Sequence, residues 1–181
     1  MSDYLALIAC GAPLASRVHE VATAAIDAGW LVRVVATASA LNWVDAEAVE
    51  QVTGHPPLVD QRRPGEPKRF PPPGHVVVFP ATFNSVNKLA TGIMDTYAAG
   101  VMCEALATGT PLTIVPMVSD KLWGHPAWSG HLATLATAGV TFIDVRSGQA
   151  GVPQPIEAGS GDDVASAFDP ASALVAAQRM L

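Results

Sequence analysis

Short apolar runs alternate along this chain with segments whose apolar residues recur at helical spacing. The runs are rich in Val, Ile and Leu, which is typical of strands buried on both faces of a sheet. The predicted strands are residues 4–9, 31–36, 76–79, 112–115 and 140–143. The predicted helices are residues 14–28, 45–52, 84–107 with a break near Gly100, 126–138, and 165–181 with an interruption at Asp169-Pro170. This alternation predicts a mostly parallel sheet with helices on both faces.

The length of 181 residues fits one domain of ordinary size, so residues 1–181 are expected to form a single Rossmann-like (flavodoxin-like) three-layer α/β domain. Two segments, 54–74 and 145–163, are rich in Gly and Pro and are predicted to be irregular. Irregular segments of this length are usually functional lids, subunit-contact arms or disordered pieces. Their composition does not choose among these three.

The net charge of the chain indicates which classes of binding partner are not expected. The net charge is -6 and only 14% of the residues are charged, so binding to nucleic acid or to an anionic membrane is not expected. The low charge content agrees with a large core or with extensive subunit contacts. No signal-peptide pattern opens the sequence and no apolar run approaches about 20 residues, so a cytoplasmic location is expected. Cys10 and Cys103 lie in apolar surroundings and are predicted to be buried free thiols, with no metal site.

Small and hydroxyl-bearing residues follow three of the predicted strands. Gly11 and Ala12 follow the first strand, Thr37 and Ser39 the second, and the run Pro80-Ala81-Thr82-Phe83-Asn84-Ser85 the third. In a parallel sheet these turns meet at one edge, where the N–H groups at helix starts bind phosphate. Each hydroxyl could equally be a helix cap. No GxGxxG pattern is present, which disfavours an NAD site.

The run from Pro80 to Ser85, with Asn87 to Asp95 after it, resembles the PASANT motif and following helix of the homo-oligomeric flavin-containing cysteine decarboxylases. That family includes phosphopantothenoylcysteine decarboxylases and the peptidyl-cysteine decarboxylases of lantibiotic biosynthesis. The stretch Pro116-Met117-Val118-Ser119-Asp120-Lys121-Leu122-Trp123 is similar to the family's PxMNxxMW motif. The resemblance covers roughly residues 4–144, with the blocks in the same order and at matching spacing.

The resemblance implies FMN as the cofactor and a small-molecule or peptide substrate. It implies phosphate contacts at the Gly11 turn and an assembly of trimers or multiples of trimers, with FMN at the subunit boundary. Carried onto this sequence, the flavin-binding positions are Gly11, Ala12, Thr37, Ser39, Trp43, Thr82, Phe83, Asn84, Ser85 and Met117, and the substrate-binding position is Ser119. Trp43 and Phe83 could instead be ordinary core residues.

Three departures from the family pattern concern the reaction. The position of the family's catalytic histidine holds Glu66, and only His75 and His55 are nearby candidates. Ser119 replaces the asparagine that holds the substrate carboxylate, and no cysteine follows residue 103. His125 and His131 could suggest a metal site, but a capping or subunit-contact role fits their spacing better.

Three functions remain open from the sequence. The first is an FMN enzyme that performs oxidative decarboxylation of a cysteine-like carboxylate. The second is a catalytically divergent FMN-binding regulatory or assembly subunit, which the loss of the histidine and asparagine would permit. The third is a flavin prenyltransferase of the UbiX type, whose turn is similar to the one at Pro80.

Overall fold

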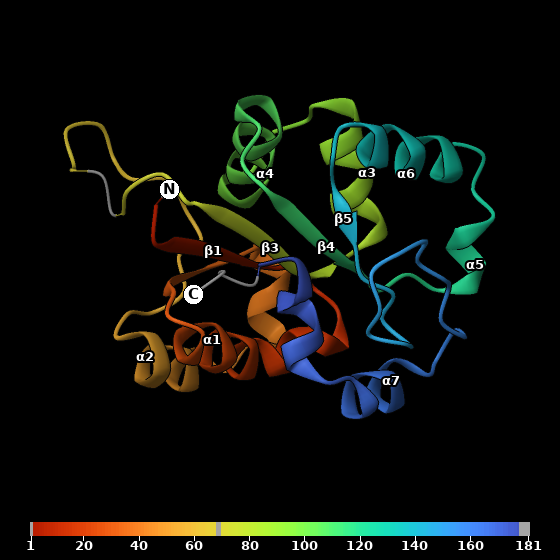
Figure 1. Cartoon of the computed structure of the whole chain (residues 1–181), viewed down its shortest axis with the longest axis horizontal. Coiled ribbons are helices and arrows are strands. Elements are labelled where there is room, and N and C mark those ends of the chain that lie inside the picture. Colours follow the sequence, from red (N-terminus) through yellow and green to blue (C-terminus); the bar gives the residue numbers. More distant parts are fainter. Residues whose placement is uncertain (1, 68–69, 178–181) are drawn as a thin grey trace.

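A parallel sheet forms the centre of the computed structural model, which describes residues 2–67 and 70–177 (Figure 1). Its strand order is β2-β1-β3-β4-β5, and all neighbours are parallel. The bounds are β1 (Tyr4–Ala9), β2 (Leu31–Ala36), β3 (His75–Ala81), β4 (Leu112–Pro116) and β5 (Thr141–Phe142). The predicted flavodoxin-like α/β fold is therefore confirmed, although β5 is shorter than the predicted strand.

Helices cover both faces of the sheet, as Figure 1 shows. Alternate residues of β1 face opposite layers: Leu5 and Leu7 belong to one buried cluster, and Ala6 and Ile8 to the other. The first layer contains the 3-10 helix η1 (Pro13–Arg17), α1 (Val18–Asp27), α2 (Ala46–Thr53), α7 (Gly161–Ala167) and the 3-10 helix η3 (Pro170–Ala177). The second contains α3 (Phe83–Thr91), α4 (Tyr97–Thr108) and α6 (Trp128–Thr137).

The long helix predicted over residues 84–107 consists of two helices, α3 and α4. The chain breaks at Gly92, whose φ of 72° is left-handed and ends α3, and the side chain of Thr96 caps α4. Gly100 is buried inside α4, so the predicted position of the break was wrong. A left-handed φ is available to any glycine, and the sequence alone does not show which one adopts it.

The C-terminal part begins its helical structure earlier than predicted. Helix α7 starts at Gly161, and η3 is a 3-10 rather than an α-helix, while the predicted interruption at Asp169-Pro170 is confirmed. Residues 178–181 of that predicted helix lie outside the described residues. The guanidinium of Arg17 donates to the main-chain carbonyls of Ala165 and Phe168. These hydrogen bonds join the end of α7 to η1 in the first helical layer.

The described residues of the 54–74 segment contain no helix or strand, as predicted. Leu58 extends the sheet edge locally, because its N–H donates to the carbonyl of Val34 and its own carbonyl accepts from Ala36, at 2.9 and 2.8 Å. Within residues 2–67 and 70–177, no helix has both the length and the apolar character needed to cross a bilayer.

Candidate functional site: a cavity at the carboxyl edge of the sheet

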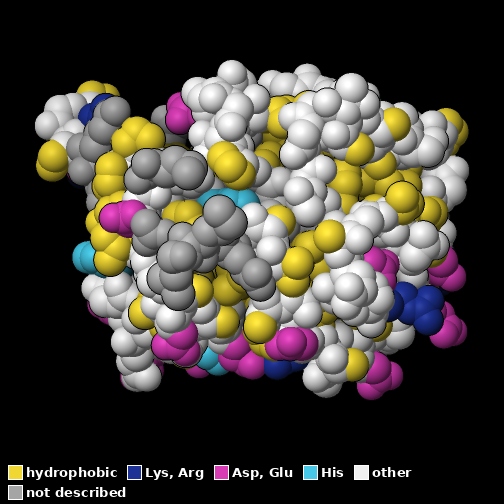
Figure 2. Space-filling model, in the orientation of Figure 1, with side chains coloured by type: hydrophobic (Ala, Val, Ile, Leu, Met, Phe, Trp, Pro, Cys, Tyr) yellow, Lys and Arg dark blue, Asp and Glu magenta, His cyan; other side chains and the backbone are white. Residues whose placement is uncertain are grey.

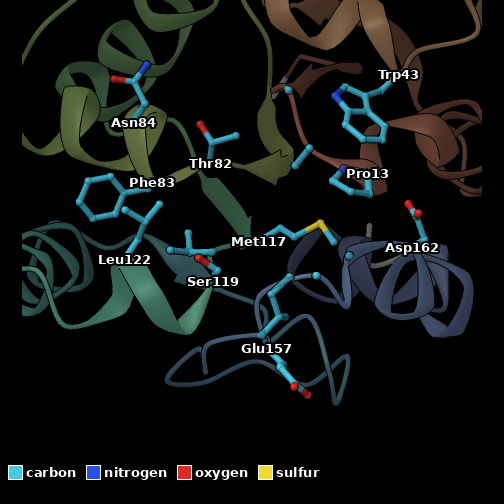
Figure 3. Close-up of a pocket in the computed structure, with 16 residues that line it drawn as sticks. Pro13, Trp43, Thr82, Phe83, Asn84, Met117, Ser119, Leu122, Glu157 and Asp162 are labelled. Carbon is cyan, nitrogen blue, oxygen red and sulfur yellow. The ribbon is translucent and has the colours of Figure 1, made fainter.

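The turns that follow β1, β3 and β4 meet around a cavity of about 580 Å³ (Figure 3). Both its volume and its position at the carboxyl ends of parallel strands are typical of small-molecule sites. Most of its lining is apolar or uncharged. The lining residues are Gly11, Ala12, Pro13, Trp43, Thr82, Phe83, Asn84, Met117, Val118, Ser119, Leu122, Ile156, Glu157, Gly159, Gly161 and Asp162.

The first turn lies directly against the turn after β2. A side chain at Gly11 would place its Cβ 2.7 Å from Oγ, 2.8 Å from Cβ and 3.0 Å from the carbonyl carbon of Ser39. Glycine is therefore required here for the two turns to touch. Thr37 and Ser39, whose hydroxyls are 3.2 Å apart, lie behind Gly11 and do not line the cavity. They support the first turn, which does line it.

The 3-10 helix η2 (Ala38–Asn42) leads from this turn to Trp43. The Trp43 side chain is 41% exposed and forms one side of the cavity mouth, near Pro13 (Figure 3). Because so much of the ring is exposed, ordinary core packing does not account for Trp43. The indole is placed so that a ligand could cover it.

The third turn begins α3 and supplies Thr82, Phe83 and Asn84 to the cavity. Thr82 is the N-cap: its Oγ1 accepts from the Ser85 N–H at 3.3 Å and lies 3.0 Å from the Ser85 Oγ. Thr82 therefore has both of the roles considered for it, since it caps the helix and also lines the cavity. Ser85 is buried behind it and does not line the cavity.

Phe83 connects the cavity wall to a group of aromatic side chains. Its ring stacks on Trp128 with centroids 5.1 Å apart and meets the ring of His125 edge-on at 5.4 Å. Trp123, at the end of the short helix α5 (Asp120–Trp123), packs edge-on against Trp128 at 5.2 Å. Phe83 is thus half-buried against the core and also forms a wall of the cavity.

The two histidines of this region serve separate local roles. His125 accepts from the Ala127 N–H through Nδ1 at 3.2 Å, near the start of α6, and His131 contacts Asn87 on α3 with Nδ1 and Oδ1 2.7 Å apart. Across the part of the chain that the structure describes, no three His, Cys, Asp or Glu residues gather in a way that could hold a metal ion.

The turn that follows β4, called the fourth turn, is joined to a distant segment that forms another wall of the cavity, residues 156–162. Ser119 pairs in parallel with Ile156: the Ile156 N–H donates to Val118 at 3.0 Å, and the Asp120 N–H donates to Ile156 at 2.8 Å. The carboxylate of Asp120 also accepts from the Ala158 N–H at 3.1 Å. These bonds fix residues 156–158 beside the fourth turn, and segment 156–162 continues along the cavity to α7, where Gly161 lies against Pro13. Sequence reasoning missed this segment because its position depends on long-range contacts.

Asp144 organises the rest of this added segment. Its carboxylate accepts from the N–H groups of Ser147 at 2.9 Å, Gln154 at 2.8 Å and Arg146 at 3.2 Å. Burial acts to raise the pKa of Asp144, but these N–H donors outweigh it and hold the pKa below its ordinary value. Segment 145–163, predicted to be irregular, is therefore fixed at Asp120 and at Asp144, and its last residues begin α7.

Neither candidate histidine lines the cavity. His75 begins β3, at the end of the strand opposite the cavity, where it is buried and its Nε2 lies 2.9 Å from the Thr113 hydroxyl. Burial lowers the pKa of His75 to about 4, so its ring is neutral at physiological pH. His55 is exposed just after α2, and Glu66 is half-buried in the turn where its carboxylate accepts from the Arg63 N–H. The titratable side chains that do line the cavity are Glu157 and Asp162.

The two cysteines differ in burial. Cys10 is a buried free thiol, as predicted, whereas Cys103 on α4 is only half-buried, so the prediction was wrong there. Burial raises the pKa of Cys10, although hydrogen bonds from the Ser85 hydroxyl and the Thr82 N–H act to lower it. Cys10 therefore lies directly behind the third turn of the cavity.

Residues 3–179 match the model of the family described as Flavoprotein. This chain belongs to the Flavoprotein family. Curated relatives include the coenzyme A biosynthesis bifunctional protein CoaBC of Thermococcus kodakarensis, 38% identical over 71 residues, which are 39% of this chain and 17% of the relative. CoaBC of Bacillus subtilis is 27% identical over 132 residues, 68% of this chain and 31% of the relative. The chain thus spans less than a third of the length of these relatives.

Several solved structures share the fold of this chain. A variant of PPC decarboxylase superposes with a TM-score of 0.68 at 23% identity, covering 83% of this chain and 91% of that one. The FMN binding protein AtHal3 gives 0.66 at 21% identity, covering 90% and 92%. The FMN-dependent cysteine decarboxylase SpaF gives 0.64 at 24% identity, covering 91% and 94%.

Proposed function

We propose that this flavoprotein binds FMN in the cavity at the carboxyl edge of its sheet. The observation that carries the proposal is the meeting of the Gly11 turn, the Thr82–Asn84 turn and Met117 around one cavity whose walls are mostly apolar. A flavin needs a flat apolar slot with a few placed hydrogen-bonding groups, and its phosphate needs exposed N–H groups and hydroxyls. AtHal3 and SpaF, which share the fold, are an FMN binding protein and an FMN-dependent enzyme.

The proposed division of the site follows from the chemistry of its turns. We assign the phosphate to the Gly11–Ala12 turn, which lines the cavity, carries no charged side chain and is supported by Thr37 and Ser39. Trp43, Phe83 and Met117 provide apolar surface suited to a flavin ring. Bound FMN would supply two-electron oxidation of a substrate, and the chain's residues would bind the ring and exclude water from it.

The reaction that we propose is oxidative decarboxylation of a cysteine-like carboxylate carried by a small molecule or a peptide. Ser119 lies in the cavity at the position where the resemblance places the substrate-binding residue, and its hydroxyl can donate one hydrogen bond to a carboxylate. The proposal is supported by the CoaBC relatives and by the fold shared with PPC decarboxylase and SpaF.

One observation favours a second candidate, an FMN-binding regulatory or assembly subunit without catalysis. Among the residues that line the cavity there is no His, Lys, Arg or Cys, and the candidate histidines His75 and His55 lie elsewhere. A proton carrier would then have to be Glu157 or Asp162, and both are exposed. This arrangement suits binding better than acid–base chemistry.

Assembly into a homo-oligomer, a trimer or a multiple of trimers, is part of the same proposal. Large apolar side chains are exposed: Trp43 and Leu122, at 46%, line the cavity, and Met94, at 52%, lies in the loop after α3. Figure 2, a view of one face of the molecule, shows hydrophobic side chains exposed over its middle, while acidic ones lie mostly along the edge where Figure 1 places α1, α2 and α7. A clean monomer that binds FMN tightly would contradict the proposed assembly, and light scattering on the purified protein measures it.

The test of the proposed function is FMN titration of the purified protein, followed by flavin fluorescence and by thermal unfolding. At an FMN concentration about 100 times Kd, binding should stabilise the protein by about 2.7 kcal/mol. Asn84→Ala should weaken FMN binding, because Asn84 lines the cavity, whereas Asn87→Ala on the same helix should not, because Asn87 faces His131. Protein that neither contains flavin nor binds added FMN would refute the proposal.

A second measurement separates the candidate reactions. Under anaerobic conditions, peptides with a C-terminal cysteine and phosphopantothenoylcysteine are mixed with the FMN-loaded protein. Carbon dioxide release with bleaching of the flavin supports decarboxylation, and bound flavin that no thiol carboxylate bleaches supports the regulatory subunit. Mass spectrometry of the extracted cofactor covers the third possibility, because a prenylated flavin has a different mass from FMN.

A further inference from the structure

The end of the cavity assigned to the phosphate offers few hydrogen-bond donors. Pro13 has no N–H, and the Ala12 N–H is already used, because it donates to the Cys10 carbonyl at 2.9 Å. Within residues 11–13, all of which the structure describes, the Gly11 N–H alone has no main-chain acceptor. A phosphate at this turn would therefore receive few of the main-chain hydrogen bonds that phosphate sites usually provide.

The side chains around this turn do not replace the missing donors. The hydroxyls of Thr37 and Ser39 lie 3.2 Å apart behind the turn, so one of their two hydrogens is used in the bond between them. The nearest cation in the sequence is Arg17, whose guanidinium donates to both carboxylate oxygens of Glu20, at 2.8 and 2.7 Å, and to the Ala165 carbonyl at 2.8 Å. Among the described residues that line the cavity there is no Lys, Arg or His, so a phosphate has no cationic side chain to pair with there.

An acidic side chain lies at this same end of the cavity. Asp162 lines the cavity from the first turn of α7, and Figure 3 shows its carboxylate on the same side as Pro13 and Trp43. Contacts at both ends of α7 fix this position. At the start a Cβ on Gly161 would lie 2.8 Å from the Pro13 Cγ, and at the end Arg17 donates to main-chain carbonyls. The first turn of α7 also brings N–H groups to this place, but the carboxylate of Asp162 offsets their partial positive charge.

We propose that Asp162 is a specificity-determining residue which removes the advantage of a phosphorylated flavin, so that the cavity does not select FMN over riboflavin. A phosphate monoester carries a charge of about −1.5 to −2 at neutral pH, and the carboxylate of Asp162 repels it. The flavin is then held mainly through its ring, by the apolar surface of Trp43, Phe83 and Met117. This inference rests on the proposed function and adds which flavins the site accepts.

The test measures the Kd of FMN and the Kd of riboflavin for the same purified protein, freed of bound flavin, by calorimetry or by quenching of flavin fluorescence. Each hydrogen bond to a charged phosphate is worth about tenfold to a hundredfold in affinity. A cavity with several such bonds would therefore prefer FMN strongly. We expect the preference of this protein for FMN to stay below about tenfold, and a larger preference would overturn the inference.

Asp162→Asn tests whether the carboxylate is the cause. Its loss should raise FMN affinity about twofold to fivefold, the size of an exposed ionic interaction, and leave riboflavin affinity unchanged. Because an effect on folding would change both affinities, the ratio of the two reports on the phosphate alone. Asp163→Asn is the matched control: it removes the same charge from the neighbouring exposed residue, which does not line the cavity, so the ratio should stay as in the wild type. A ratio that Asp162→Asn leaves unchanged, or that both variants change equally, would overturn the role of Asp162.

The outcomes separate this inference from the proposed function. Wild-type protein that binds neither flavin overturns both. Wild-type protein that binds riboflavin but not FMN overturns only FMN as the cofactor, whereas FMN binding more than about tenfold tighter than riboflavin binding overturns only the inference. Similar Kd values for the two flavins, together with an Asp162→Asn variant that gains affinity for FMN alone, support both.

Discussion

Substituting Gly11 by alanine tests whether contact between the first two turns builds the cavity. The added Cβ would lie 2.7 to 3.0 Å from three atoms of Ser39, closer than real Cβ contacts. The Ser39 Oγ can rotate away, but its Cβ and carbonyl carbon move only with the backbone. Overpacking of this kind costs about 1–3 kcal/mol. For a chain of this size the melting temperature should fall by about 2 to 12 °C.

The assay is thermal and urea unfolding of Gly11→Ala, together with FMN titration, in which affinity should also fall because the first turn moves. Gly130→Ala is the matched control: nothing lies within 4 Å of its added Cβ on α6, so it should stabilise the protein by about 0.5–1 kcal/mol. Adding Ser39→Gly to Gly11→Ala should recover part of the stability. A Gly11→Ala variant as stable as the wild type would show that the two turns are not held in contact.

Three further predictions concern groups whose hydrogen bonds are described above. Asp144→Asn should destabilise the protein by about 1–3 kcal/mol, because an amide accepts less strongly from the three N–H groups. Because the pKa of Asp144 is lowered in the folded protein, the ionised carboxylate stabilises the fold above the ordinary carboxyl pKa, and this stabilisation is lost as pH falls below it. Measuring the free energy of unfolding at a series of acidic pH values will show the loss. His75 has its pKa lowered to about 4, so the unfolded chain binds more protons between pH 4 and about 6.5. Stability should therefore rise by up to about 3 kcal/mol across that window, and His75→Gln, which can still bond Thr113, should remove this part of the rise. Asp120→Ala releases the Ala158 N–H, so it should weaken FMN binding while changing the melting temperature by no more than about 4 °C, as calorimetry and titration can check.

Most of the fold could be predicted because its signals are local. Strands β1 to β4 are runs rich in β-branched and aliphatic residues, and burial on both faces leaves such runs continuous. The break between α3 and α4 was misplaced because Ile93 and Met94 continue an apolar pattern through the loop. The capping role of Thr96 has no distinctive spacing around it.

The candidate site was predictable only where it follows strands directly. Thr82, Phe83 and Asn84 come straight after β3, so the parallel topology already places them at the carboxyl edge. Glu157 reaches the same cavity through the pairing of Ser119 with Ile156, and Asp162 through the packing of Gly161 against Pro13; both contacts join segments far apart in the sequence. No local pattern encodes that pairing, and a Gly/Pro-rich composition gives it no periodic signal.

The added wall of the cavity has a different construction from the sheet that faces it. Ile156 is held by main-chain hydrogen bonds and by burial in the core, and Ala158 by the carboxylate of Asp120, whereas the opposite side rests on the aromatic side chains around Phe83. Sequence changes at the exposed Glu157 can therefore alter the charge of the cavity without disturbing the core. In this fold the residues that determine stability are therefore separate from an exposed position that sets the charge of the cavity.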